Sequence, residues 1–498
     1  MKRIITQTIF LWFCMLCGMA YGQTGTLYRV PLQGQDQIVR YDPGTGKHII
    51  YSLSPFGDNL FSITDLAIFT KVKVWNGWNV KDFEIIDGLV FFCGDNGSGS
   101  GFLGWFDIDS LFYNGGSVYI DQTLSSLGLL TLDNIAVYHD TTGDIRIAGY
   151  GLHAHFLPQH GLYRAFEAVG TPATGMQYRT LDLRASGKFS DISDVVVTDN
   201  FVVYLHPDRH QKCLPNVGIG ITLQPFPKYD MFGNPPFYYH FFQLAYMSTI
   251  FAPSNVLSIN NDPYNNEVDH IYTRPQMVHS FDDEIAVCTY RHDLDDNGWV
   301  PGECGTRLPS TVAYITHMKF DLSQLISSTN NPIHMTSYAL AKLPDTNTYS
   351  IDGLEFDPQT RRYLVLHRHR TAGGADEHAL TTFDFPWGGG YPTSVGTTYQ
   401  TTYNTITQWM PTGMCMDGYV NYMVAGYEQG SYEHILWRNN VGMIGGCVRV
   451  EQYPVTTLPL VPEKYHNNEA KPTIWKPLYF IRVDVGGWQE FPCEIKCN

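Results

Sequence analysis

The chain has 498 residues, a formal net charge of −16 and 16% charged residues, with 14% aromatic residues and 46 glycines. An acidic surface repels phosphate backbones and anionic lipid, so the composition argues against nucleic acid as a partner. Few charges with many aromatic residues and glycines are typical of short strands joined by turns. We therefore expect an all-β protein.

Residues 1–22 have the pattern of a secretory signal peptide. Lys2 and Arg3 precede an apolar stretch that extends to Met19, and the small residues Ala20 and Gly22 suit cleavage after residue 22. No later apolar run approaches the length of a transmembrane segment. We therefore expect an exported protein of the periplasm, the outer-membrane surface or the extracellular space, with one mature domain at 23–498.

About six copies of one pattern follow along the mature chain. Each copy has an apolar strand, an acidic turn, a second strand rich in aromatic and β-branched residues, a polar loop and a third strand. The first two strands are expected at 82–93, 134–150, 192–205, 281–290, 351–366 and 414–427. The third strands are expected at 101–108, 161–166, 311–320, 379–385 and 434–437. Turn dipeptides such as Asp87-Gly88 and Asp417-Gly418 favour tight hairpins within each copy.

The spacing of these copies predicts a β-propeller. They lie roughly 50 to 80 residues apart, which fits blades that carry long loops better than it fits a sandwich. A blade cannot bury both faces of its sheet alone, so blades pack around an axis until the ring closes. Further strands at 26–30, 37–41 and 477–483 would let the two chain ends complete a shared blade. We expect a single β-propeller of six to seven blades, closed by N- and C-terminal strands.

The strand pattern resembles that of exported β-propeller proteins of Gram-negative bacteria. The resemblance covers most of the mature chain and depends on the strand pattern alone. The WD dipeptide, the kelch double-glycine pattern and the integrin-type calcium signature are missing or incomplete. No subfamily is therefore implied.

The polar loops after the second strands carry the candidate ligand-binding residues. Histidine recurs at nearly the same point of four successive copies, so these side chains would converge near the axis as a polar or metal-binding ring. The candidates are His153, His155, His206, Asp208, His210, His292, His367, His369 and Asp376. The alternative is that these histidines follow from duplication of the repeat, or that they bond to local backbone.

One short motif suggests a calcium site. Asp293, Asp295 and Asn297 offer oxygen ligands at alternate positions, and Gly298 suits the turn of a calcium loop. The twelfth position of such a loop, normally Glu, is Cys304 here. The motif predicts either a Ca²⁺ site or an acidic turn in a long loop. The candidate cofactors are therefore Ca²⁺ or a transition metal bound by histidine.

Of the 10 cysteines, eight follow the leader, and an even number in an exported chain favours disulfides. The candidate pairs are Cys288 with Cys304, Cys415 with Cys447, and Cys493 with Cys497. Cys93 and Cys288 lie inside apolar strands, where buried thiols are an equal alternative.

Two features suggest sugar chemistry. Arg29, in the sequence Tyr-Arg-Val-Pro, is similar to the arginine with which sialidases grip a sugar carboxylate, but the repeated Ser-x-Asp-x-Gly-x-Thr-Trp box of that family is absent. We therefore interpret Arg29 as an ordinary strand residue. Loop aromatic residues such as Trp299, Tyr427 and Tyr432 would either stack on sugars or cover strand edges.

We expect an exported, non-enzymatic β-propeller that binds a glycan, a peptide or a cell-envelope partner through its loop face. The partner would be a glycan or a protein of the envelope or of a host. The alternative is a glycan-active hydrolase or lyase, which requires carboxylates and an arginine that converge in a deep axial pocket. A structural envelope component is a third possibility, and it predicts a large exposed apolar patch.

Overall fold

The computed structural model shows a chain built almost wholly of β-strands. The described residues are 26–121, 123–140, 143–154, 162–182, 192–206, 218–225, 238–245, 276–294, 307–320, 333–339, 347–370, 376–384, 387–388, 391–392, 398–402, 409–418, 421–440, 449–453, 456–458, 461–469, 471–472, 475–486 and 488–497. They form seven antiparallel sheets of five or six strands and one two-stranded sheet, β25 (Trp387–Gly388) with β26 (Tyr391–Pro392). The all-β expectation is confirmed. The predicted signal peptide at 1–22 lies outside the described residues.

Sheets 1 to 3 each take four consecutive strands, which stand side by side in sequence order. Sheet 1 has β2 (Gln35–Asp42), β3 (Lys47–Leu53), β4 (Asp58–Thr64) and β5 (Ile68–Asn76); sheet 2 has β6 (Asn79–Ile86), β7 (Leu89–Asp95), β8 (Gly101–Asp107) and β9 (Ser117–Asp121); sheet 3 has β10 (Asn134–His139), β11 (Ile145–His153), β12 (Leu162–Thr171) and β13 (Gly175–Asp182). The short helices α2 (Ile108–Tyr113) and η1 (Thr123–Leu127) lie in the connections next to β9.

Sheets 4 to 7 repeat this plan with two exceptions: β25 and β26 lie between the third and fourth strands of sheet 6, and the fourth strand of sheet 7 comes from the N-terminal part of the chain. Sheet 4 has β14 (Asp194–Val197), β15 (Phe201–His206), β16 (Gly218–Pro225) and β17 (Tyr238–Ala245); sheet 5 has β18 (Gln276–His279), β19 (Glu284–Leu294), β20 (Arg307–Phe320) and β21 (Ile333–Ala339); sheet 6 has β22 (Asn347–Asp357), β23 (Arg362–Arg370), β24 (Asp376–Asp384) and β27 (Thr398–Thr402); sheet 7 has β28 (Trp409–Met416), β29 (Asn421–Glu428), β30 (Glu433–Asn440) and β1 (Thr26–Gln33). The N-terminal strand is thus the fourth strand of the last sheet.

The C-terminal segment adds an outer strand to every one of these sheets. We call residues 449–497 the belt. In chain order its strands pair with sheets 6, 5, 4, 3, 2, 1 and 7, the reverse of the direction in which the rest of the chain visits them. They are β31 (Arg449–Tyr453), β32 (Thr456–Leu458), β33 (Val461–Glu469), β34 (Lys471–Pro472) with β35 (Lys476–Pro477), β36 (Phe480–Asp484), β37 (Trp488–Pro492) and β38 (Glu494–Cys497).

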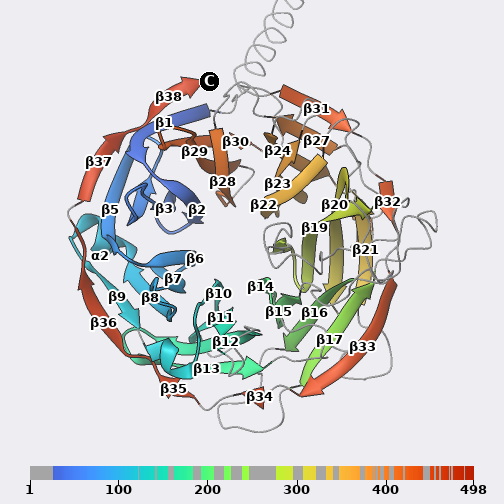
Figure 1. Cartoon of the computed structure of the whole chain (residues 1–498), viewed down its shortest axis with the longest axis horizontal. Coiled ribbons are helices and arrows are strands. Elements are labelled where there is room, and N and C mark those ends of the chain that lie inside the picture. The colour runs from blue at the N-terminus through green and yellow to red at the C-terminus, as the bar shows by residue number, and fades with distance from the viewer. Residues whose placement is uncertain are drawn as a thin grey trace, which may run out of the picture.

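The sheets are arranged around a circle, with their first strands nearest the centre and the belt strands at the rim (Figure 1). The first strands β2, β6, β10, β14, β18, β22 and β28 contact one another in that order, and β28 contacts β2. Strand β1 lies between β30 and β38, so both chain ends belong to sheet 7. The sequence placed strand 477–483 in that closing sheet, whereas the structure pairs it with sheet 2 as β36.

Apolar clusters fill the space between neighbouring sheets. Between sheets 1 and 2, the ring centroid of Phe61 lies 5.0 Å from that of Phe106 and 5.4 Å from that of Phe92. Phe91, the residue before Phe92, belongs instead to the cluster between sheets 2 and 3. Successive residues of β7 therefore serve two cores, which explains a continuous apolar run where a half-exposed strand would alternate.

The hairpin turn between β6 and β7 follows directly from its sequence. Asp87 and Gly88 have φ angles of 51° and 77°, and a two-residue hairpin turn with both φ angles positive matches the twist of its strands. Gly104 on β8 has a different reason to be glycine, because a Cβ atom there would overlap the Phe92 ring.

Within the described residues, no helix is long and apolar enough to span a membrane.

The structure corrects the disulfide prediction. Cys93, Cys288, Cys415 and Cys493 are free thiols, so the structure shows none of the pairs proposed for Cys288, Cys415 and Cys493, and the proposed partners Cys304 and Cys447 lie outside the described residues. Cys93 and Cys288 are fully buried, as the alternative of buried thiols requires. Burial in an apolar core raises the pKa of the Cys288 thiol well above its usual range, which makes this thiol a poor nucleophile.

Candidate functional site

The predicted histidines lie at corresponding positions of sheets 3 to 6. His153 and His206 are the last residues of the second strands β11 and β15, and His292 lies near the end of β19. His367 and His369 lie on β23, the second strand of sheet 6. We call the end of the ring at which the second strands finish and the third strands begin the loop face.

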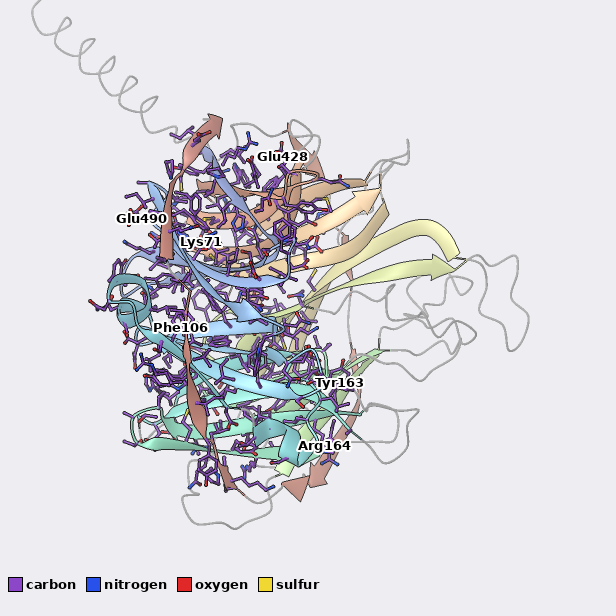
Figure 2. All side chains as sticks on the ribbon, turned by 60° about the vertical axis from the view of Figure 1, so that its left-hand side comes forward. Lys71, Phe106, Tyr163, Arg164, Glu428 and Glu490 are labelled. Atoms are coloured by element: carbon purple, nitrogen blue, oxygen red, sulfur yellow. The ribbon has the colours of Figure 1, made fainter. Side chains whose placement is uncertain are left out.

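Figure 2 shows this face from the side. Tyr163 and Arg164 on β12, together with Glu428 on β29, lie toward the side on which the long β19–β20 hairpin projects. Lys71 on β5 and Glu490 on β37 lie together at the rim.

His153 is held by local packing. Its backbone forms a bridge with Leu129, and the amide of Ala154 donates to the carbonyl of Gly128 at 2.7 Å. A Cβ atom on Gly128 would lie 3.1 Å from the His153 ring, so the imidazole sits directly over this glycine. The half-buried ring therefore has a packing role whether or not it also contacts a ligand.

His367 is enclosed within sheet 6. His367 is 2% exposed, and it pairs with Ile351 on β22 and with Ala379 on β24. A ligand on the loop face would not reach this ring without moving the sheet.

Only some of the other candidate residues lie in the described part of the chain. His206, His292, Asp293, His369 and Asp376 lie on described strands, whereas His155, Asp208, His210, Asp295 and Asn297 lie outside the described residues. Among the residues that the structure describes, no group of three or more His, Cys, Asp or Glu is arranged to hold a metal ion. The calcium and histidine-metal sites stay predictions.

A charged cluster lies on the first strands instead, next to the centre of the ring. On β2, the Nε atom of Arg40 lies 2.9 Å from Glu84 Oε1, and its Nη2 atom lies 2.9 Å from Asp82 Oδ1. Both carboxylates belong to β6 of the neighbouring sheet. Asp82 is almost fully buried, whereas the side chains of Arg40 and Glu84 are 27% and 31% exposed. We call Arg40, Asp82, Glu84, Asp194 and Glu355 the axial cluster.

Two aspartates of the axial cluster hold neighbouring sheets together. Asp82 Oδ2 accepts the amide of Ile135, on the first strand of sheet 3, at 3.1 Å. Asp194 on β14 accepts the amide of Met277, on the first strand of sheet 5, at 2.6 Å and that of Val195 at 2.9 Å. The same contact thus recurs two sheets further along the ring, and it satisfies amides of strands that no sheet partner covers on the axial side.

Burial shifts the protonation of these carboxyls. It raises the pKa of Asp82 to about 7 and that of Asp194 to about 8, although Arg40 opposes both shifts. Burial also raises the pKa of Glu355 on β22 to about 7, against the attraction of Arg40 and with the repulsion of Glu84. Carboxyls in this range exchange protons near neutral pH, as general acids do.

Arg29, the sialidase-like residue, is engaged by acidic side chains of its own sheet. It forms an ion pair with Glu433, and its Nη2 atom lies 3.5 Å from Glu428 Oε2. Ser431 donates to the same Glu428 oxygen at 2.7 Å. Two carboxylates already neutralise this guanidinium, which supports the interpretation of Arg29 as a strand residue.

An aromatic pair marks the loop face of sheet 7. The rings of Tyr427 and Tyr432 stack with centroids 5.8 Å apart and planes at 29°, and both side chains are half-buried. Tyr432 has a φ angle of 58°, in the left-handed region that favours glycine. Its amide donates to the carbonyl of Glu428 and its carbonyl accepts from the amide of Gly34, both at 2.8 Å, so the turn fixes the ring.

Sequence reasoning missed the axial cluster because its members look like ordinary strand residues. Asp82 and Glu84, Asp194, and Glu355 all interrupt apolar first strands that are otherwise buried. An acidic residue inside such a strand was the available signal, since a buried carboxylate requires a partner. Its partners lie on other sheets, and the sequence does not place those sheets.

The comparisons with known proteins leave the site to be interpreted from its own geometry. No protein-family model matches the chain, and no curated protein matches it.

Proposed function

We propose that the protein is an exported β-propeller of seven blades that binds a glycan on its loop face. The cyclic contacts of the first strands and the place of β1 in the last sheet support a ring in which each of the seven sheets is one blade. The predicted leader would direct the chain out of the cytoplasm, and cleavage after residue 22 would then free it in the periplasm, at the outer-membrane surface or in the extracellular space.

The stacked pair of Tyr427 and Tyr432 carries the glycan proposal. Aromatic faces bind the apolar faces of sugar rings, and the hydroxyl of a tyrosine adds a hydrogen bond. The left-handed conformation costs a residue with a Cβ atom about 1–2 kcal/mol, so Tyr432 sits where glycine would be more stable. A large, half-exposed aromatic side chain at such a position is more readily explained by what it contacts outside the protein than by the fold.

A glycan array followed by titration calorimetry with the best ligand tests this proposal. Tyr432→Gly relieves the backbone strain while it loses the ring contact, so we expect unfolding stability close to that of the parent chain and at least tenfold weaker binding. Phe56→Ala is the matched control, because Phe56 is 81% exposed on the turn between the second and third strands of sheet 1. Equal affinity of the parent chain and Tyr432→Gly would overturn the tyrosine site.

The axial cluster favours a second candidate, a glycan-active hydrolase or lyase. Glu355 is a candidate general acid, because burial holds its pKa at about 7. Glu84 is a partly exposed carboxylate whose charge adds to the raised pKa of Glu355, but both Glu84 and Asp82 are paired with Arg40. Wild-type turnover of a glycan that Glu355→Gln abolishes, with binding retained, would support this candidate. Turnover unaffected by Glu355→Gln would exclude this carboxyl from the chemistry.

A further inference from the structure

The belt is bound in a different way from the strands beneath it. Each belt strand pairs with the fourth strand of a sheet and not with another belt strand; β34 and β35 both pair with β13 of sheet 3, and every other belt strand pairs with a different sheet. Among the belt side chains that the structure describes, Leu478 is buried at 7% exposure, whereas Tyr479, Ile481 and Ile495 are 64%, 48% and 60% exposed. Backbone hydrogen bonds and a few anchors therefore hold the belt.

The ring does not depend on the belt to close. Strand β1 supplies the fourth strand of sheet 7, and an apolar cluster between sheets 7 and 1 contains Val30 and Leu32 of β1 with Val39 and Ile50 of sheet 1. The belt strand β38 lies outside β1. Each sheet would keep four strands if the belt left, and the clusters between the sheets would lose only the belt side chains at their outer edge, such as Leu478 and Phe491.

The anchors between residues 475 and 493 lie at separate points, and of those described only Leu478 is buried, while Phe480, Val485, Phe491 and Cys493 are partly buried against the clusters between the sheets. Trp475 lies under the guanidinium of Arg179, whose Cζ atom is 4.4 Å from the ring centroid. The amide of Leu478 donates to the carbonyl of Met176 at 2.9 Å, and that of Cys493 donates to the carbonyl of Ala67 at 3.2 Å. Segments with few buried apolar contacts open at a lower free energy than the core does.

We propose that the outer edges of β1, β5, β9 and β13 are a strand-binding surface from which belt residues 475–497 detach as one unit, and that the same segment of a second copy of this chain can take their place. These edges are rows of backbone donors and acceptors, and an exposed strand edge pairs with another strand. The second copy is the partner that fits, because the belt already pairs with these edges in a defined register.

Four thiols are free among the residues that the structure describes, and they report on this opening in the full-length mature chain. Cys493 lies in the belt, with its Sγ atom 3.8 Å from Thr64 Oγ1, whereas Cys93, Cys288 and Cys415 are buried within the sheets. Time-resolved alkylation, read peptide by peptide in a mass spectrometer, separates the two classes. Comparing one thiol between variants removes differences in intrinsic reactivity.

The decisive variant is Leu478→Ala, which truncates the buried anchor far from Cys493. If 475–497 detaches as a unit, alkylation of Cys493 should accelerate by about tenfold or more, while Cys93, Cys288 and Cys415 keep their rates. Ile481→Ala is the matched control, since Ile481 is a half-exposed belt residue, and it should leave Cys493 unchanged. No effect of Leu478→Ala on Cys493, or equal acceleration of all four thiols, would overturn the independent opening.

A synthetic peptide of residues 475–497 with a fluorescent label tests the surface itself. It should become incorporated into the full-length protein over time, faster with Leu478→Ala than with the parent chain, while a scrambled peptide should not. Where Leu478→Ala fails to fold, Trp475→Ala replaces it. A peptide that never binds, under conditions in which Cys493 does react, would show that the belt opens but that the edges accept no strand from another copy.

Discussion

The inner strands and the belt occupy the same sheets, yet they are stabilised in opposite ways. Phe91 and Phe92 on β7 are buried in two different cores, whereas Tyr479 and Ile481 at the rim are largely exposed although both are apolar. The inner strands therefore depend on side-chain burial, and the outer ones on backbone pairing. Membership of a sheet alone does not predict what a residue contributes to stability. Substitutions in the inner strands should therefore lower the unfolding free energy more than substitutions in the belt.

The largest effect should come from Phe92→Ala. The ring is almost fully buried and packs 5.4 Å from Phe61, so its loss leaves a cavity that should cost about 3–5 kcal/mol of unfolding free energy. Tyr479→Ala removes an aromatic ring at the rim and should change stability by less than about 0.5 kcal/mol. Urea unfolding measures both, and similar losses for the two variants would remove the distinction between inner and outer strands.

Arg40→Met should have the next largest effect. Removal of the guanidinium leaves the buried Asp82 carboxylate without its cation, and breaking a buried pair costs about 3–5 kcal/mol. Arg40 is partly exposed, so we expect about 2–3 kcal/mol here. A second change, Asp82→Asn, should restore part of this loss. If Arg40→Met left the melting temperature unchanged, the ion pair of Arg40 would not contribute to the stability of the inner strands.

The pH dependence of thermal stability should show the contribution of Asp194, which also lies on an inner strand. The pKa of Asp194 rises from its ordinary value to about 8 on folding, so the folded chain binds more protons than the unfolded chain and is destabilised as pH rises from about 4 to 8. The charged groups that act on Asp194 are Asp82 and Arg40. Relative to Asp194→Asn, the parent chain should lose thermal stability steadily across this window. A constant difference between the two melting temperatures would contradict the shift.

A small effect, between that of Arg40→Met and that of Tyr479→Ala, should come from Trp475→Ala in the belt. It removes a contact of a cation with an aromatic face, worth about 0.5–1 kcal/mol at a partly exposed site. Arg179 keeps its ion pair with Glu167 at 2.7 Å, so the sheet beneath should stay intact. Hydrogen exchange should therefore quicken in the belt and stay unchanged in β12. Faster exchange in β12 as well would show that the belt supports the sheet it covers.

The same contrast explains what the sequence could predict. The first two strands of sheets 2, 3, 4, 6 and 7 lie where the apolar pattern placed them, because burial on both faces imposes a continuous apolar run. In sheet 5 the predicted range 281–290 contains the second strand, whereas the first strand, β18, lies before it. Sheet 1 was not among the six predicted copies of the repeat, although its first strand was predicted at 37–41. The belt was missed except for 477–483, because its strands are short and polar and contain Pro472, Pro477 and Pro492, which ordinarily argue against a strand. An outermost strand tolerates proline, since one of its edges has no partner in the sheet.

The candidate site residues also differ in whether the sequence could predict them. The corresponding positions of the histidines were predictable from the chain, because His153, His206, His292, His367 and His369 belong to second strands that are visible in the sequence. The axial cluster was not, since the contact of Arg40 with Asp82 and the contact of Asp194 with Met277 both depend on which sheets become neighbours. Burial of His367 was also hidden, because the sequence places this residue near a strand end and the pairing extends past it.

The place of β1 in sheet 7 sets the order of folding during synthesis. Arg29 on β1 faces Ile435 on β30, so β1 has no partner until nearly the whole chain has been made. Contacts between residues so far apart in sequence slow folding. Six sheets can form from local hairpins in the meantime, while the N-terminal strand waits as an unpaired edge. The interval between its arrival and that of β30 is when this protein is most exposed to aggregation or to binding by a chaperone.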